Sequence, residues 1–538
     1  MQLSKQAHIQ LKWEANYWKA QHRRALARIA ELEKEIERLE AKNCDLQQRL
    51  FGRRSEKSGA KSEPLQPPVS GPKRQRGQQP NSPGHGRSDR SLLPVVVTEQ
   101  DIAEEAKRCS ICGAVHRRLP LTEESEIIEV EVRAHRRRIR RAVYRRGCQC
   151  EGQGELIIAP PAPRVYPKAT LGVSVWTEVL LDKYLYLRPT YRLCQALADR
   201  GFELSPGTLT DGLRRLEPLF EPLLAALHEK QLTEPHMHGD ETRWEVFEAI
   251  EGKVGHRWYL WVFRSASVVF YRLEPTRGAR VPKAHLAELR VEALIFSCDR
   301  YSAYKCLANA IHVIILAFCW AHVRRDFLQL ARGYPTLTDW ALGWVEAIAR
   351  LYHLNGQRLQ HWDRDHALDA QSPPYQIHQR ALEAQLSVMT ERRERDLASE
   401  TLHPAAGKVL TSLGEHWPGL IVFAAHPEVP MDNNPGERSL RLPVTGRKNF
   451  YGSGSLWSAR LAAGVLTVLQ TIRLWGLNPH HWLYAWLQAC ADSGGQSPSD
   501  LSPFLPWQMD EARRGELSQP LPGSQPRASP TTSFHDTS

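Results

Sequence analysis

The sequence contains no apolar run long enough to cross a membrane. Its longest uninterrupted apolar stretch, Val313 to Trp320, has the length of a strand, whereas a membrane helix needs about 20 consecutive apolar residues. The N-terminus is polar and lacks the apolar core of a secretory signal. We therefore expect a cytoplasmic protein with no membrane partner.

Cysteine is sparse, with 10 among 538 residues, which argues against a disulfide scaffold of the kind found in small secreted proteins. Four of these cysteines form two close pairs, Cys109 with Cys112 and Cys148 with Cys150. Four thiolates can complete a tetrahedral zinc site, so the spacing favours structural Zn²⁺ over unligated thiols. Because an alternating, strand-like segment at 126–132 lies between the pairs, we predict a zinc-ribbon-like module over residues 99–165.

Acidic residues are outnumbered by basic ones, giving a net charge of +11 and a pI near 9.2. This balance favours a polyanionic partner, nucleic acid first, over a merely soluble basic protein. The basic residues gather in two places. One is a Pro-, Gly-, Ser- and Gln-rich stretch at 51–98, predicted to be a flexible linker. The other is the arginine-rich segment from Arg133 to Arg146, predicted to be the returning strand of the zinc module.

The arginines of that second segment are candidate DNA contacts, with DNA phosphate favoured over an acidic protein surface. The candidates are Arg137, Arg138, Arg140 and Arg141.

Residues 8–50 contain neither proline nor glycine and carry a heptad pattern. Leucine recurs at d positions and isoleucine at a positions, while Asn43 occupies another a position. This combination is typical of a two-stranded parallel coiled coil whose register is fixed by the asparagine. The alternative is an amphipathic helix packed on its own domain. The coiled coil predicts a homodimer or a higher oligomer.

Residues 166–232 are predicted to be helical. One helix ends near Gly201, and Ser205-Pro206 supplies the start of the next. The spacing fits a helix-turn-helix, with Arg214 among its exposed residues, and it fits two ordinary packed helices equally well.

A strand-rich pattern follows, and we predict a catalytic core over residues 233–480. Three strands ending near 244, 263 and 273 precede a helix at 282–290, a strand at 293–299, another helix and a strand at 311–320. This is the element order of a ribonuclease-H-like core. A helical insertion is predicted at about 328–425, a helical C-terminal part at 481–515 and a disordered tail at 516–538. The whole chain is thus predicted to be multidomain, of mixed α+β and α/β class.

Three carboxylates occupy informative places in this pattern. Asp240 and Asp299 are predicted at strand ends, and Glu437 follows the helix-start signals Asn433 and Pro435. Taken alone, Glu437 fits a capped surface helix in which it pairs with Arg441. Taken together, carboxylates from three separate elements are what two hard divalent ions need for phosphoryl transfer. We therefore predict a site for two Mg²⁺ or Mn²⁺ ions.

Several motifs, kept in order from about residue 30 to 508, resemble the bacterial insertion sequence 66 family of DDE transposases. They are Phe51-Gly52-Arg53-Arg54-Ser55-Glu56-Lys57, the four-cysteine finger, Gly239-Asp240-Glu241-Thr242, Asp299-Arg300-Tyr301-Ser302-Ala303-Tyr304, Cys319-Trp320-Ala321-His322-Val323-Arg324-Arg325, Asp432-Asn433-Asn434 through Glu437-Arg438, Gly446-Arg447-Lys448-Asn449-Phe450, Gly452-Ser453, Gly476-Leu477-Asn478-Pro479 and Leu505-Pro506-Trp507. Arg300 departs from the family, which often has glycine there.

The resemblance implies that Asp240 bridges both ions while Asp299 and Glu437 each hold one. It implies a transposase that cleaves DNA at the ends of an insertion sequence and joins them to target DNA, with accessory proteins of the element as further partners. It also implies a bacterial protein that joins the nucleoid when bound to DNA. Charge and position add further candidate DNA contacts, namely Arg325, Arg438, Arg441, Arg447 and Lys448. A nuclease without strand transfer and a non-catalytic DNA-binding protein are the alternatives.

Overall fold

The computed structural model describes residues 5–51, 97, 101, 103, 107–108, 110–117, 134–145, 156–249, 251, 255–362 and 370–520. The chain divides into two compact units. The first comprises Met1–Ser62, Pro163–Leu193 and Ser205–Ser518, and the second comprises Glu63–Ala162, Cys194–Leu204 and Gln519–Ser538. Among the described residues, no helix is long and apolar enough to span a membrane.

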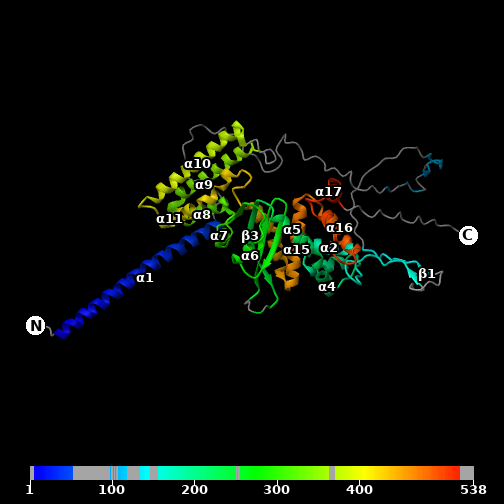
Figure 1. Cartoon of the computed structure of the whole chain (residues 1–538), viewed down its shortest axis with the longest axis horizontal. Helices are drawn as coiled ribbons and strands as arrows, with labels where there is room; N and C mark the ends of the chain where they lie inside the picture. The colour runs from blue at the N-terminus through cyan, green and yellow to red at the C-terminus, as the bar shows by residue number, and fades with distance from the viewer. Residues whose placement is uncertain are drawn as a thin grey trace. The chain divides into compact units, whose positions relative to one another are not determined.

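A six-stranded mixed sheet forms the centre of the first unit, and Figure 1 shows it in green. Its strands are β3 (His236–Val246), β4 (Arg257–Arg264), β5 (Val269–Glu274), β6 (Leu294–Cys298), β7 (Ile314–Phe318) and the short β8 (Gly452–Ser453). The order along the sheet is β5-β4-β3-β6-β7, with β8 paired to β3. The first three strands are antiparallel, while β6 and β7 add in parallel. The predicted succession of strands is therefore present.

Two helices in this part of the chain connect the strands, α6 (Arg280–His285) and α7 (Ser302–Ala310). Helix α6 is shorter than the predicted 282–290, because Leu286 caps it and a turn closes at Leu289. Aromatic side chains from the sheet and the following helices form the core, including Trp261, Phe296 and Trp320, all fully buried. Trp344 is a third buried tryptophan of this core, and large rings of this kind contribute most to the area that a core buries.

The edge strand β5 is covered by helix α15 (Leu456–Leu474), which stands beside the sheet in Figure 1. The Thr467 hydroxyl accepts a hydrogen bond from Tyr271 N at 2.9 Å, and the Thr471 hydroxyl accepts one from Val269 N at 3.1 Å. These two threonines satisfy outward-facing amides that an open sheet edge would leave unpaired. Helix α15 thereby closes one side of the sheet.

A group of helices lies between β7 and the segment that carries Glu437. They are α8 (Trp320–Gly333), α9 (Thr338–Leu359), α10 (Pro373–Leu397), α11 (Pro404–Glu415), α12 (Trp417–Leu420) and α13 (Val422–Ala425), with a short 3-10 turn at Pro335–Leu337. The buried guanidinium of Arg358 donates to Gln379 Oε1 at 2.7 Å and to the carbonyls of Phe423 and Ala424 at 2.8 Å. One cation thus joins α9, α10 and α13, with all its bonds inside the group.

The long N-terminal helix α1 (Lys5–Phe51) contacts this helical group near its C-terminal end. Arg332 Nε lies 2.8 Å from Asp45 Oδ1, and His403 Nε2 lies 2.9 Å from Glu37 Oε1. A Cβ added at Gly333 would lie 3.1 Å from the Ala41 carbonyl oxygen, so the helices α1 and α8 approach closely. The rest of α1 extends away from the group in Figure 1.

The remaining helices of the first unit are α2 (Val173–Tyr184), α4 (Pro206–Leu216), α5 (Glu221–Gln231), α14 (Asn434–Phe450), α16 (Pro479–Asp492) and α17 (Glu511–Ser518), with 3-10 turns at Glu217–Phe220 and Ser502–Phe504. Ser205 caps α4 by accepting from Thr208 N, as the sequence indicates. Helix α17 continues to Ser518, so the chain is still helical at 516, where a disordered tail was expected. The preceding helix, α3 (Thr190–Ala198), has residues in both units.

The second unit contains one described pair of strands, β1 (Val143–Arg145) and β2 (Leu156–Ile158), which pair antiparallel. The strand expected over the whole arginine-rich segment is wrong for 134–142, which are exposed and have no regular structure. Clustered like charges in that stretch leave no alternating apolar face for a strand to bury. The predicted zinc ligands Cys109, Cys148 and Cys150 lie outside the described residues, and Cys112 is exposed.

Two helix glycines offer a matched test of packing. A Cβ at Gly212 in α4 would lie 1.9 Å from the ring of the buried Trp176, whereas a Cβ at Gly356 in α9 meets nothing within 4 Å. Gly212→Ala should therefore destabilise the protein by about 1–3 kcal/mol through overpacking. Gly356→Ala should be neutral or stabilising by up to ~1 kcal/mol, because alanine favours a helix. Urea unfolding measures both, and equal shifts for the two variants would contradict this account of the α2–α4 contact.

Candidate active site

Asp240 lies inside strand β3 rather than at its end, which corrects the sequence-based placement. The strand continues to Val246, and Asp240 pairs with Val262 of β4. On the other side of β3, however, the parallel pairing with β6 stops at His238 opposite Ser297. Asp240 therefore stands just beyond the point where β6 ends, at the same edge of the sheet as Asp299.

Asp299 follows directly after the last residue of β6, as predicted. Its Oδ1 accepts a hydrogen bond from the backbone amide of Tyr301 at 2.9 Å, which fixes the turn that enters α7. The carboxyl group is half-buried. One oxygen is thus engaged by the turn, while the second is available to a ligand.

Several acidic side chains lie near Asp240 and affect its ionisation. The pKa of Asp240 is raised to about 7, mainly by burial and in addition by the neighbouring charges of Glu241, Asp299 and Glu437. The backbone amide of Glu241, which donates to Asp240 Oδ1 at 2.8 Å, acts in the opposite direction. Carboxylates this close to one another repel each other when they ionise. A divalent cation bound to their oxygens would relieve this repulsion.

Glu437 lies in the first turn of helix α14. Its backbone amide donates to the carbonyl of Asn433 at 3.0 Å, and Asp432 Oδ1 accepts from Asn434 N at 3.0 Å. The helix therefore begins where the sequence indicates, although Asn433 makes no side-chain cap. The side chain of Glu437 faces the start of α8, with its nearest ion-pair partner at His322. A pair between Glu437 and Arg441 is not found in the described part of the chain.

Asn433 is buried and holds this loop against the sheet. Its Oδ1 lies 2.9 Å from His238 Nδ1, and its Nδ2 donates to the carbonyl of Gly239 at 2.9 Å. Its backbone amide donates to the sulfur of Cys319 at 3.2 Å. Asn433 therefore connects the strand of Asp240 with the helix of Glu437.

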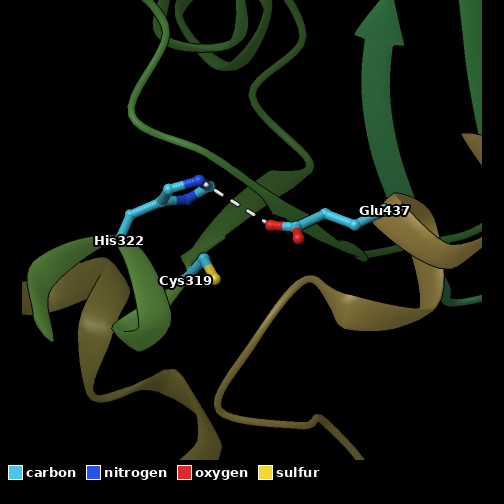
Figure 2. Close-up of side chains that lie close together, drawn as sticks. All are labelled: Cys319, His322 and Glu437. Carbon is cyan, nitrogen blue, oxygen red and sulfur yellow. Dashed lines mark ion pairs between the residues drawn. The ribbon is translucent and has the colours of Figure 1, made fainter. Parts of the chain in front are cut away.

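Figure 2 shows a second group of side chains at Glu437, in which the His322 ring and the carboxylate point toward each other above the sulfur of Cys319. His322 Nε2 lies 3.7 Å from Glu437 Oε1. Each of the three residues offers a ligand atom, and these atoms lie within 4.8 Å of one another. Within the described ranges, the ligand atoms of Cys319, His322 and Glu437 all lie within this distance of one another. Those of Asp240, Asp299 and Glu437 do not.

Glu241, the neighbour of Asp240, is engaged in a different environment. Its Oε1 lies 2.6 Å from Arg277 Nη2, and its Oε2 accepts from the Tyr304 hydroxyl at 2.5 Å. Its side chain is only 3% exposed. Because these two partners occupy both oxygens, Glu241 serves the packing of β3 on α7 and leaves Asp240 as the available carboxylate of the pair.

Arg300 has a structural role that explains its place after the second aspartate. It forms an ion pair with Asp326 on α8 and donates to Ser412 Oγ on α11 at 3.2 Å. Arg300 therefore ties the end of β6 to the helical group.

The basic residues predicted to contact DNA differ in how far they are exposed to solvent. Arg325 on α8, Arg438, Arg441 and Lys448 on α14, and Arg214 on α4 are exposed. Arg447 is half-buried and donates to Thr242 Oγ1 at 3.3 Å and to the carbonyl of Arg243, so it braces strand β3. In the second unit Arg137, Arg138, Arg140 and Arg141 are exposed, and Arg141 also donates to the Ala159 carbonyl at 3.2 Å.

An open groove of 1210 Å³ lies at the far ends of β3 and β4. Its lining is cationic and aromatic and includes His256, Arg257, Arg277, Arg447, Lys448, Phe247, Tyr259 and Tyr451. Tyr451 is 72% exposed and Phe247 is 49% exposed. Exposed aromatic rings beside cations are the elements that bind single-stranded nucleic acid.

Residues 168–461 match the model of the transposase IS66 family. This span is more than half of the chain, and it contains Asp240, Asp299 and Glu437. The chain belongs to the transposase IS66 family.

Relatives of this IS66 family transposase include two proteins of Sinorhizobium fredii (strain NBRC 101917 / NGR234). "Uncharacterized protein y4jD" is 27% identical over 78% of this chain and 81% of its own length. "Uncharacterized protein y4hP" is 27% identical over 66% of this chain and 66% of its own length.

Two solved structures of the Mos1 transposase also resemble parts of the chain. The strand transfer complex is 16% identical, with a TM-score of 0.12, and covers 31% of this chain and 60% of the Mos1 chain. The paired-end complex with the left transposon end is 17% identical, with a TM-score of 0.13, and covers 37% of this chain and 75% of the Mos1 chain. Likeness at such TM-scores carries no weight for the fold or function of this IS66 family transposase.

The raised pKa of Asp240 gives a pH-dependent prediction for this IS66 family transposase. The unfolded carboxyl titrates near its ordinary value of 3.8, and the folded one at about 7. The stability contributed by the bound proton is therefore complete below about pH 4 and is lost as the pH rises to about 7. Asp240→Asn mimics the protonated form, so without divalent cations it should melt higher than the wild type, with a larger gain at about pH 8 than at about pH 5.5.

Thermal melts at both pH values measure the difference. The exposed Asp199→Asn serves as a control for the change in net charge. An equal gain for Asp240→Asn at the two pH values would contradict the assignment of a strongly raised pKa.

Proposed function

We propose that this protein is a DNA transposase that binds the ends of an insertion sequence and catalyses divalent-metal-dependent strand cleavage and strand transfer. The observation that carries the proposal is the position of Asp240 just beyond the end of the β3–β6 pairing, at the same sheet edge as Asp299. The charges of Asp299 and Glu437 also act on Asp240, after the larger effects of burial and Glu241. The sheet order, with three antiparallel strands followed by two parallel ones, supports a ribonuclease-H-like core. The family match spans all three residues.

The donor set fits hard divalent cations. Asp240, Asp299 and Glu437 offer carboxylate oxygens, the ligands that Mg²⁺ and Mn²⁺ prefer. Glu437 Oε1 is buried and accepts no hydrogen bond in the described part of the chain, although His322 Nε2 lies 3.7 Å away, so binding an ion would cost this oxygen no hydrogen bond. In this proposal Asp240 faces both of two ions, while Asp299 and Glu437 each hold one.

The protein's own residues would orient the reaction. In cleavage, a water oxygen bonds to phosphorus as the bond to the leaving sugar oxygen breaks. In transfer, the freed 3′-hydroxyl oxygen bonds to a target phosphorus and the target's sugar oxygen leaves. Bound divalent ions supply an activated oxygen nucleophile and stabilise the leaving oxygen. The Tyr301 amide and Asn433 hold Asp299 and the start of α14 in place, which limits how far their carboxylates can move.

DNA would follow the exposed cations of the first unit. Arg325 stands on α8, whose start Glu437 faces, and Arg438 follows Glu437 on α14. Lys448 lines the groove beside β3 and β4. Contacts of this kind neutralise phosphates and make the affinity fall steeply as salt rises. The four-cysteine zinc module, with its exposed arginines, would add a further DNA-binding surface. Element ends and target DNA are thus the proposed partners, together with accessory proteins of the element.

Helix α1 would dimerise the protein. Its d-position side chains Leu32, Leu39 and Leu46 are between 45% and 50% exposed. Successive helix residues are rotated by about 100°, so this seam lies roughly opposite Glu37, Ala41 and Asp45, which face α8 and α11. Docking on the helical group therefore leaves the seam free to pair with a second copy in a parallel coiled coil.

Catalysis is tested with a labelled element end, Mg²⁺ and target DNA. Asp240→Asn, Asp299→Asn and Glu437→Gln should each reduce joined product by at least ~100-fold, because each removes a charged ligand oxygen while keeping the side-chain shape. DNA binding measured by gel shift should persist. The exposed Glu400→Gln is the matched control and should keep its activity.

The outcomes separate the candidate functions. Cleavage without joining by the wild type would indicate a nuclease. Binding with neither cleavage nor joining would indicate a non-catalytic DNA-binding protein. Wild-type rates in all three variants would remove the site assignment.

Dimerisation is tested by introducing charged residues at the d positions of helix α1. Leu32→Lys combined with Leu39→Lys should convert a dimer to a monomer, because two lysines would be buried at d positions. Ala30→Lys combined with Glu31→Lys places the same residue type on exposed b and c positions, which face away from the seam, and should leave the dimer intact. Sedimentation equilibrium gives the mass, and an unchanged mass in the leucine variant would argue against the coiled coil.

A further inference from the structure

Three side chains of different chemistry meet at Glu437, and only one of them belongs to the proposed pair of hard-ion sites. Cys319 is buried, whereas the side chains of His322 and Glu437 are 23% and 35% exposed. Their ligand atoms lie within 4.8 Å of one another (Figure 2). A thiol has no role in binding Mg²⁺, which prefers oxygen. The presence of Cys319 and His322 therefore needs a separate explanation.

Local structure brings these residues together. Cys319 is the last residue before α8, and His322 follows three positions later in the first turn. Residues three apart lie on the same side of a helix, so sulfur and imidazole face the same way. The Asn433 amide donates to the Cys319 sulfur at 3.2 Å and fixes the loop that delivers Glu437 opposite them. Burial raises the pKa of the Cys319 thiol, and this amide acts in the opposite direction by favouring the thiolate, the form that binds metal.

Two buried polar atoms of this group, Glu437 Oε1 and His322 Nδ1, have no hydrogen-bond partner in the described part of the chain. Of these two, Glu437 Oε1 is the atom that faces the His322 Nε2 nitrogen. The distance of 3.7 Å from His322 Nε2 to Glu437 Oε1 is too long for a hydrogen bond. Two ligands of one tetrahedral zinc ion, each bonded at about 2.0–2.1 Å, lie roughly 3.4 Å apart. The spacing thus suits an ion between the two atoms better than a direct bond.

We propose that Cys319, His322 and Glu437 form a binding site for a borderline-soft transition-metal ion, Zn²⁺ first, with one position left to solvent. On binding, the Cys319 thiol releases its proton to solvent and a sulfur–metal bond forms. Because Glu437 is shared, occupancy of this site withdraws it from the Mg²⁺ pair. Zn²⁺ therefore inhibits strand cleavage. This last consequence rests on the proposed transposase function, whereas binding itself does not.

Binding is tested with Co²⁺ as a spectroscopic substitute for Zn²⁺. The full-length wild type should bind one more equivalent of Co²⁺ than Cys319→Ser, with additional sulfur-to-metal charge-transfer absorption. The comparison subtracts any contribution from the four-cysteine module, which both proteins retain. Cys306→Ser removes an exposed cysteine outside the group and should bind as the wild type does. His322→Gln, which keeps the thiol, should also lose the extra equivalent, so a folding defect in one variant does not decide the outcome.

Inhibition is measured by titrating Zn²⁺ into cleavage reactions at fixed Mg²⁺, each variant being normalised to its own rate without Zn²⁺. The concentration for half inhibition should rise at least tenfold in Cys319→Ser and stay unchanged in Cys306→Ser. Equal Co²⁺ stoichiometry in wild type, Cys319→Ser and His322→Gln would overturn the site. If the wild type cleaves no DNA but the Co²⁺ difference persists, the proposed function fails and the metal site stands.

Discussion

The buried side chain of Asn433 is the constraint on which the geometry of the candidate site depends. Its side chain contacts His238 and Gly239 on β3, and its backbone amide donates to Cys319 at the start of α8, so Asn433 joins two segments that are far apart in the sequence. A buried side-chain amide that both donates and accepts hydrogen bonds is costly to displace, because a shift leaves buried polar groups unpaired. Strand β3 carries Asp240 and α14 carries Glu437, so this one residue sets the distance between two of the three carboxylates.

The partner of Asn433 also keeps this connection independent of pH. The pKa of His238 is lowered to about 3, mainly by burial and in addition by the neighbouring His236. A neutral imidazole therefore faces Asn433 across the physiological range, and its Nδ1 proton can be donated to the amide oxygen. The negative charge gathered around Asp240 is consequently not balanced by His238. Arg277 neutralises Glu241, which leaves the excess of negative charge near Asp240 available to bound cations.

Local patterns in the sequence predicted the elements better than the contacts between them. Asp299 follows a short, fully apolar strand, and Glu437 follows residues that begin helices, so both positions could be predicted. Asp240 was predicted at the end of β3, but β3 continues along β4 after its pairing with β6 has ended. The sequence of one strand does not show how long its neighbour is, so this position could not be predicted. The partners of Arg300, Asp326 and Ser412, could not be predicted for a similar reason. The motif from Cys319 to His322 was visible, but its approach to Glu437 depends on burial and on a loop more than a hundred residues away.

The helical group between β7 and α14 does not disturb the candidate site, because the chain enters and leaves this group beside one residue, Trp320. The backbone amide of Trp320 donates to the Met431 carbonyl at 2.9 Å, and its indole donates to the Leu420 carbonyl at 2.7 Å. Trp320 is fully buried and stands at the first position of α8. The chain thus leaves the helical group at Met431, next to Cys319. Asn433 follows two residues later with its own contacts. A second connection lies at Arg300, the residue after Asp299, which contacts α8 and α11, so the helical group is fixed to the sheet on both sides of the candidate site.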